Sequence, residues 1–257
     1  MELQSIEKKI RKQLKSTNFS ISINDDAWEY NWMNGLRIKV SKYLDLRPTS
    51  KLLDVGCGDG WFSIQNALFY QDVDFFGIDM FEAKEAKDLS KHLGVKNCRF
   101  YEMDALKIKF KNKFDYIVLF LSLGNICENS SDMKKLFKNC LNVMKKDAKL
   151  LIVEPFEEDF PPNVRKKEEK MYKCYKISGE SVYDEKENVL KRKSTLKILN
   201  KMRFKILKIK KKKFKWSMNK KEVMKYFKFE KLPFDIPKKF WVHDKPKQAT
   251  IIMAKTT

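Results

Sequence analysis

Between residues 51 and 155 the sequence alternates short apolar stretches with longer amphipathic ones, and this alternation constrains the fold more than any other feature. The apolar stretches have the length of buried strands: Leu52–Val55, Asp74–Asp79, Cys98–Met103, Asp115–Phe120 and Leu150–Val153. Apolar residues at helical spacing lie between them, at 61–70, 82–93 and 131–146. Strands that alternate with helices in this way predict an α/β fold with a doubly wound parallel sheet.

The rest of the chain frames this region. We expect a helical N-terminal cap over residues 1–46, whose second helix buries Leu36, Val40, Tyr43 and Leu44. Residues 47–155 form the ligand-binding core, and residues 156–202, where the regularity is lost, are expected to be an inserted lid or substrate-facing segment. Residues 203–257 are expected to supply two more strands, at 204–216 and 249–254, with a helix at 219–229 between them. The whole length of 257 residues suits a single domain.

The positive charge of the chain is concentrated in its C-terminal third. The formal net charge is +21. Residues 1–160 carry 25 lysines and arginines against 24 acidic residues, whereas residues 161–257 carry 30 against 10. A genomic preference for lysine would be spread evenly along the chain. The asymmetry therefore indicates a local role, such as contact with an anion.

The cysteines and histidines do not form the pattern of a metal site. The five cysteines include no Cys-x-x-Cys pair, which suits a reducing compartment, and the two histidines have no third ligand nearby. No run of 18 apolar residues occurs, and the first residues lack the order of a signal peptide. We therefore expect a cytoplasmic protein with no catalytic metal and no membrane contact.

A glycine-rich turn follows the first predicted strand. Gly56, Gly58 and Gly60 lie where that strand becomes a helix, which lets the backbone approach a ligand and directs free helix N–H groups at it. The NAD fingerprint G-x-G-x-x-G is one residue longer, and position 61 here is Trp61. Asp54, two residues before the first glycine, would repel a pyrophosphate but favour a cationic sulfonium ligand. The turn therefore disfavours NAD.

Two further acidic residues follow the next predicted strands. Asp79, 21 residues after Gly58, is placed to accept hydrogen bonds from both hydroxyls of a ribose. Asp104 can accept one from an adenine amino group. Each acid alone is more often a helix cap or a turn residue. Their joint occurrence with the glycine turn, at successive strand ends, predicts a nucleoside site.

These residues closely resemble the class I S-adenosylmethionine-dependent methyltransferase family, over about residues 35–155. The resemblance implies a Rossmann-like, doubly wound, seven-stranded and mostly parallel sheet, with an antiparallel last strand inserted between strands five and six. It implies S-adenosyl-L-methionine as the cofactor. The cofactor-binding residues that it implies are Asp54, Gly56, Cys57, Gly58, Gly60, Asp79, Met80, Asp104, Ala105, Phe120 and Leu121.

The sequence does not identify the methyl acceptor. In-line transfer requires mainly that acceptor, methyl and sulfur are aligned, so no catalytic base is predicted. The family's amide and exocyclic-amine methylases carry Asn/Asp-Pro-Pro-Tyr/Phe after strand four, where residues 122–125 here read Ser-Leu-Gly-Asn, which disfavours such acceptors. Asn125, Glu154 and Tyr30 could face the acceptor, although a capping or packing role suits each better.

Three functional hypotheses follow. The first is transfer to a small molecule, which the basic C-terminal third would favour if the molecule is anionic. The second is an RNA methyltransferase, because residues 191–215 contain 13 lysines or arginines and no acid, with aromatic residues between them; the scarcity of arginine argues against it. The third is a non-catalytic cofactor-binding subunit that docks on a partner, which the intact glycine turn and acids disfavour.

Overall fold

A computed structural model gives the fold of the chain. It describes residues 5–6, 8–10, 12, 36–37, 39–160, 177, 190–213, 217–218, 220–226, 229–232, 240–241 and 248–256. Of the segment 156–202 that was expected to be a lid, residues 161–176 and 178–189 lie outside the described residues, as does Tyr30.

The central feature is a seven-stranded sheet. Its strands are β1 (Lys51–Val55), β2 (Asp74–Asp79), β3 (Cys98–Glu102), β4 (Phe114–Phe120), β5 (Met144–Glu154), β6 (Phe204–Lys213) and β9 (Gln248–Thr256). They are ordered β3-β2-β1-β4-β5-β9-β6. The pairs from β3 to β5 are parallel, and β9 runs antiparallel to both of its neighbours. The predicted sheet, with its last strand antiparallel and inserted between the fifth and sixth, is confirmed.

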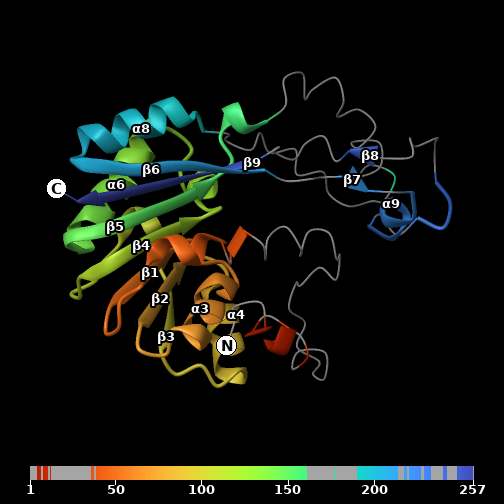
Figure 1. The fold of residues 1–257 in the computed structure, drawn as a ribbon, viewed down its shortest axis with the longest axis horizontal. Coiled ribbons are helices and arrows are strands. Elements are labelled where there is room, and N and C mark those ends of the chain that lie inside the picture. The colour runs from red at the N-terminus through yellow and green to blue at the C-terminus, as the bar shows by residue number, and fades with distance from the viewer. Residues whose placement is uncertain are drawn as a thin grey trace.

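Helices cover both faces of this sheet (Figure 1). The helices α3 (Trp61–Phe69) and α4 (Ala83–His92) pack on one face, and α6 (Ser130–Val143) and α8 (Arg192–Lys201) pack on the other. The short helix α5 (Leu123–Ile126) follows β4, and α9 (Lys220–Tyr226) lies away from this sheet. Two 3₁₀ turns are η1 (Ala105–Lys107) and η2 (Glu157–Asp159). A separate two-stranded sheet pairs β7 (Ser217–Met218) with β8 (Phe240–Trp241). None of the helices in the described segments has both the length and the hydropathy that crossing a membrane requires.

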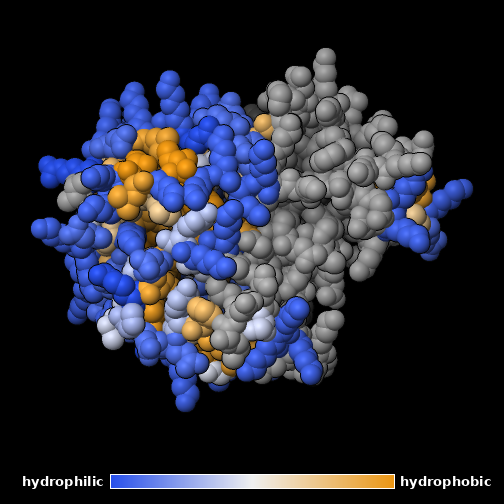
Figure 2. All heavy atoms as spheres, in the orientation of Figure 1, coloured by the Kyte–Doolittle hydropathy of each residue, from blue (hydrophilic) through white to orange (hydrophobic). Residues whose placement is uncertain are grey.

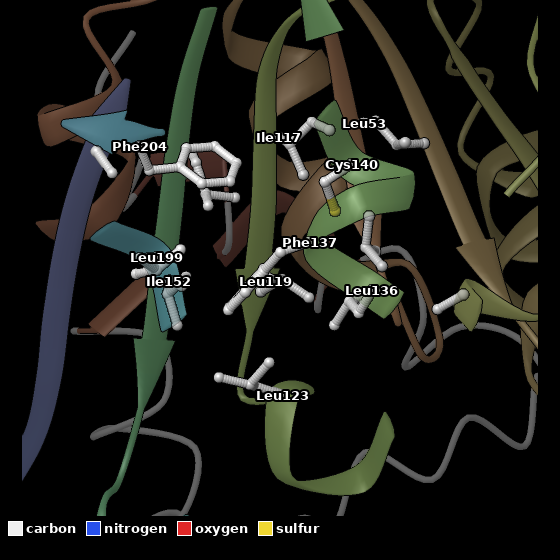
Figure 3. Close-up of a cluster of buried hydrophobic side chains, with 14 of the residues drawn as sticks. Leu53, Ile117, Leu119, Leu123, Leu136, Phe137, Cys140, Ile152, Leu199 and Phe204 are labelled. Carbon is white, nitrogen blue, oxygen red and sulfur yellow. The ribbon is translucent and has the colours of Figure 1, made fainter. Parts of the chain in front are cut away.

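Alternate residues of the strands feed two hydrophobic clusters, one on each face. Ile117 and Leu119 of β4 belong to the cluster under α6 and α8, whereas Tyr116 and Val118 belong to the cluster under α3 and α4. Figure 3 shows side chains of the first cluster directed from α6 toward the strands. The side chain of Phe137 there lies 6.2 Å from that of Phe204, measured between ring centroids. Each such fully buried side chain stabilises the fold by roughly 1.5–3 kcal/mol. Packing on both faces therefore stabilises the sheet and holds the ends of its strands in place.

The N-terminal segment packs on the second cluster. Residues 36–37 and 39–44 are helical, and Leu36, Val40 and Leu44 are buried there, as predicted, with Tyr43 partly buried. Ile6 and Ile10 join the same cluster.

The segment 156–202 differs from the expectation at its C-terminal end. Instead of an inserted segment as far as residue 202, the structure has the helix α8, which buries Thr195, Ile198 and Leu199 against the sheet. This short apolar stripe was missed in the sequence because basic residues, among them Lys193 and Lys197, alternate with it.

A buried carboxylate ties this helix to the sheet. Asp159 of η2 accepts hydrogen bonds from Arg192 Nη1 at 3.3 Å, Gln248 Nε2 at 2.8 Å and Thr250 Oγ1 at 2.6 Å. Its side chain is fully enclosed, so these partners satisfy a charge that would otherwise be costly to bury. Asp159 thereby joins η2, α8 and β9.

Candidate active site

A cleft of about 660 Å³ opens where β1, β2 and β4 end. This is the carboxyl edge of the sheet, at the point between β1 and β4 where the strand order reverses, which is where open α/β sheets bind ligands. Nine of the eleven residues predicted from the sequence line the cleft, namely Gly56, Cys57, Gly58, Asp79, Met80, Asp104, Ala105, Phe120 and Leu121. Asp54 and Gly60 do not line it.

The glycine turn has the backbone geometry that only glycine accepts without strain. Gly56 has φ +70°, and its N–H donates to the carbonyl of Ile78 at 2.8 Å. A Cβ at Gly56 would lie 2.6 Å from Cβ of Ser122, so β1 and β4 approach each other too closely for a side chain. Gly60 (φ +76°) has a different role: a Cβ there would meet Phe100 at 2.6 Å, so this glycine allows the turn to pack on β3.

The carboxylate of Asp79 connects the end of β2 to the glycine turn. Its Oδ2 accepts a hydrogen bond from the N–H of Gly58 at 2.9 Å. Its Oδ1 accepts from the N–H groups of Phe81 at 2.9 Å and Glu82 at 3.0 Å. A carboxylate oxygen has room for further donors, so Asp79 can hold the turn and still accept from a ligand in the cleft.

Asp104 and Met80 form the part of the cleft beside β3. The Oδ1 of Asp104 caps η1 by accepting from the N–H of Leu106 at 2.8 Å, and its Oδ2 lies 3.3 Å from the ammonium of Lys107. The Asp104 side chain is 30% exposed, so it remains accessible to a donor. Met80 is half-exposed and presents an apolar surface on the neighbouring strand end.

Asp54 lies behind the glycine turn instead of on the cleft wall. It is buried, and its Oδ2 accepts a hydrogen bond from Ser63 Oγ at 2.8 Å. Within the described part of the chain, its Oδ1 has no hydrogen-bond partner. Burial raises the pKa of Asp54 to about 7. Asp54 can therefore act on a bound ligand only electrostatically, across the glycine turn, and not by direct contact.

The turn after β4 closes one side of the cleft. Leu121 has φ +55°, which is strained for a leucine. Ser122 Oγ donates to the carbonyl of Val55 at 2.7 Å, and the N–H of Leu123 donates to Glu154 Oε2 at 3.0 Å. Of the residues considered for the acceptor, Asn125 lines the cleft, whereas Glu154 is buried and holds this turn.

Several cleft residues were missed from the sequence. They are Arg37, Asp59, Trp61, Phe62, Ile78, Phe81, Glu82, Met103, Leu106, Ser122, Asn125, Ile126 and Glu128. Asp59 and Ser122 lie in segments that were expected beside the cofactor, and Asn125 was considered for the acceptor, but none was predicted to bind the cofactor. No sequence pattern indicated that Arg37 lines the cleft, because it lies in a helix remote in sequence from the glycine turn. Phe81 is 80% exposed, an unusual position for a phenylalanine that only the structure reveals.

The cysteines of the described residues are not activated. Burial raises the pKa of Cys57 and of the other buried thiols, so they stay protonated at neutral pH and do not act as nucleophiles. No group of three or more histidine, cysteine or carboxylate side chains comes together as a metal site among the residues that the structure describes.

Comparisons with known proteins agree with this geometry. The family described as "Methyltransferase domain" matches residues 46–231. The chain is 23% identical over 155 residues to demethylmenaquinone methyltransferase of Bacillus mycoides, covering 59% of this chain and 64% of that protein. It is 28% identical over 95 residues to ribosomal RNA small subunit methyltransferase G of Phocaeicola vulgatus, covering 36% of this chain and 44% of that protein. The chain thus spans less than two thirds of the length of these curated relatives.

A solved structure shares the fold over nearly the whole chain. N-methyltransferase NodS from Bradyrhizobium japonicum, in complex with S-adenosyl-L-homocysteine, superposes with a TM-score of 0.57 at 12% identity, covering 99% of this chain and 97% of that one. Sheet order, fold and family together define the class of protein: a methyltransferase domain with the Rossmann-like class I fold. The chain belongs to the methyltransferase domain family.

Proposed function

We propose that this protein transfers the methyl group of S-adenosylmethionine to a small-molecule acceptor bound at the same cleft. One observation carries the proposal: the glycine turn, Asp79 and Asp104 converge on one cleft at the carboxyl edge of the sheet. The third hypothesis, a non-catalytic cofactor-binding subunit, predicts the same cleft, and the methyl-transfer assay below separates the two.

The residues of the cleft fit the cofactor part by part. Asp104 and the apolar surfaces of Met80 and Ala105 suit an adenine, and Asp79 has acceptor capacity for ribose hydroxyls. The turn at Gly56–Gly60 lets the ligand approach the backbone closely. The acids on the wall favour a ligand that carries positive charge at its sulfonium and ammonium groups.

The chain's own contribution to the reaction is alignment. Bound S-adenosylmethionine supplies an electrophilic methyl group. The turn after β4, fixed by the hydrogen bonds of Ser122 and Leu123, holds Leu121 and Asn125 at the side of the cleft where an acceptor can approach. Rigid placement of this kind lowers the entropic cost of bringing two reactants into line. We assign no residue as a general base.

A small-molecule acceptor is supported by the relationship to demethylmenaquinone methyltransferases, whose name specifies a small-molecule substrate. The charge of the cleft does not favour an anionic acceptor, although the basic C-terminal third suggested one. The described wall includes Asp59, Asp79, Glu82, Asp104 and Glu128, against Arg37.

The RNA hypothesis depends on lysines that lie away from the cleft. Of the basic segment 191–215, the structure describes α8 and β6, where Lys205, Lys208, Lys211 and Lys213 are exposed. In the sheet order β6 is three strands from β4, which corresponds to roughly 14 Å. Figure 2 shows the described surface as mostly hydrophilic with an apolar patch in the area where Figure 1 places β6, and Leu207 and Ile209 of that strand are exposed. This pattern is typical of an edge strand protected by lysine.

Transfer of labelled methyl from S-adenosylmethionine into a fractionated cell extract tests the proposal. We expect label in the soluble small-molecule fraction, unaffected by ribonuclease. Label in a precipitable fraction that ribonuclease removes would establish an RNA acceptor instead. Failure of the pure protein to bind S-adenosylhomocysteine by calorimetry would contradict the assignment as an enzyme of this class.

A further inference from the structure

The helix α8 and the strand β6 form a basic surface. The two elements follow each other in the chain, and β6 is an edge strand of the sheet. Residues 191–213, which include both elements, contain no acid. The lysines exposed on α8 and β6 are Lys193, Lys197, Lys201, Lys205, Lys208, Lys211 and Lys213. None of these lysines forms an ion pair with an acid of the described segments, so the surface carries uncompensated positive charge.

Two aliphatic side chains are exposed among these lysines. Leu207 is 43% exposed and Ile209 is 44% exposed. Ile209 pairs in register with Ile252 of β9, which belongs to the cluster under α8, so Ile209 lies on the face of the sheet that α8 covers. Leu207 lies where the register shifts, between Ile206 and Lys208. Figure 2 shows an apolar patch in the area where Figure 1 places β6, with hydrophilic residues around it.

Protection of the sheet edge accounts for only part of this surface. Charged side chains on an edge strand discourage pairing with another chain, whereas exposed aliphatic side chains favour it. Leu207 and Ile209 therefore act against edge protection. The lysines of α8 lie on a helix, which has no unpaired strand edge to protect. Positive charge around exposed aliphatic groups fits a partner that is anionic at its surface and apolar beneath.

We propose that α8 and β6 form a docking surface for a membrane that contains anionic phospholipids. The lysines contact the phosphate headgroups, and Leu207 and Ile209 enter the boundary between headgroups and acyl chains. The sequence suggested no membrane contact because it has no long apolar run, but contact with one side of a bilayer does not require such a run. In the sheet order β6 is three strands from β4, so docking does not depend on the proposed function of the cleft.

A single-stranded RNA fits this surface less well. Binding of RNA bases relies on aromatic side chains on which the bases stack. The described exposed residues of α8 and β6 include no aromatic residue, and Phe204, the one aromatic residue of β6, is buried.

Cosedimentation of the full chain with vesicles, without cofactor, tests this docking surface. Vesicles of phosphatidylcholine mixed with the anionic lipid phosphatidylglycerol should bind the chain, vesicles of phosphatidylcholine alone should not, and salt should weaken the binding. Changing Lys197, Lys211 and Lys213 to glutamate should weaken binding by about 100-fold, because each lysine near an anionic membrane strengthens it about fivefold. Changing Leu207 and Ile209 to serine should weaken it about tenfold.

The matched control changes three exposed lysines of α4, Lys84, Lys87 and Lys91, to glutamate, which alters the net charge by the same amount elsewhere. It should leave vesicle binding within about threefold of the wild-type value. Thermal melting of each variant checks that it is folded. Equal losses in the two lysine variants would mean that net charge alone drives binding, and unchanged binding in the serine variant would leave the aliphatic side chains without a role. Either result overturns the proposal. Absence of binding to the anionic vesicles would also overturn it, and binding of polyuridylic acid in that case would identify RNA as the partner.

Discussion

The carboxylate of Asp79 accepts a hydrogen bond from the backbone N–H of Gly58 at 2.9 Å, across 21 residues of sequence. The same carboxylate accepts from the N–H groups of Phe81 and Glu82, so one side chain fixes both the glycine turn and the start of the chain that leads into α4. The acid assigned to the ribose therefore also shapes the site in the absence of ligand. Its loss should act on binding by two routes.

Replacing Asp79 with alanine should weaken S-adenosylhomocysteine binding by about 1–3 kcal/mol, because charge-assisted bonds to the ligand are lost. The variant should also unfold at lower temperature, since three backbone donors lose their acceptor. Calorimetry and thermal melting measure the two effects. Asp74→Ala is the control on the same strand: Asp74 pairs with Arg99 at the other end of β2, on the surface, and its loss should leave binding unchanged. Unchanged affinity in Asp79→Ala would show that the ribose lies elsewhere.

Gly56→Ala should destabilise the chain more than Gly94→Ala, although both glycines have positive φ. At Gly94 nothing lies within 4 Å of the added Cβ, so the cost is backbone strain alone, about 1–2 kcal/mol. At Gly56 the methyl group would also meet Ser122 at 2.6 Å, which forces β1 and β4 apart. Urea unfolding of both variants isolates the steric part as their difference. Equal losses would contradict the close approach of the two strands.

The stability of the protein should depend on pH through Asp54. Its pKa in the folded state is about 7 against 3.8 when unperturbed, so the folded chain holds this proton more tightly than the unfolded chain. The resulting stabilisation is complete below about pH 4 and is lost as the pH rises through 7. Relative to Asp54→Asn, which does not titrate, the wild-type chain should lose about 2–3 kcal/mol between pH 5 and pH 8. Urea unfolding of both proteins at the two pH values checks this, and a constant difference would exclude a buried, protonated Asp54.

Charge reversal on β6 should leave methyl transfer to the small-molecule fraction unchanged. Changing Lys208, Lys211 and Lys213 to glutamate removes exposed charge three strands from β4, so neither cofactor affinity nor label incorporation should fall by more than about twofold. The matched control changes three exposed lysines of α4, at positions 84, 87 and 91. Selective loss of transfer in the β6 variant, with a steep dependence on salt, would favour the RNA hypothesis.

Local sequence patterns predicted the residues of the cleft that lie at the ends of regular strands. Asp79 and Asp104 were predicted from their places after apolar strands, because parallel strands bring their carboxyl ends to one edge. The helix α8 was missed since its buried stripe is short and surrounded by lysine. Asp54 was predicted on the ligand but lies behind the turn, because its direction depends on the alternation of side chains along β1.

By itself the sequence determined the alternation of strands and helices, the place of the glycine turn and the acids after the strands, since these follow from periodicities within a few residues. Only the tertiary structure decided that Arg37 reaches the cleft, that Leu121 takes a strained conformation and that Asp159 joins α8 to β9. These contacts connect residues that are far apart in sequence. They depend on how whole elements pack, which no local pattern encodes.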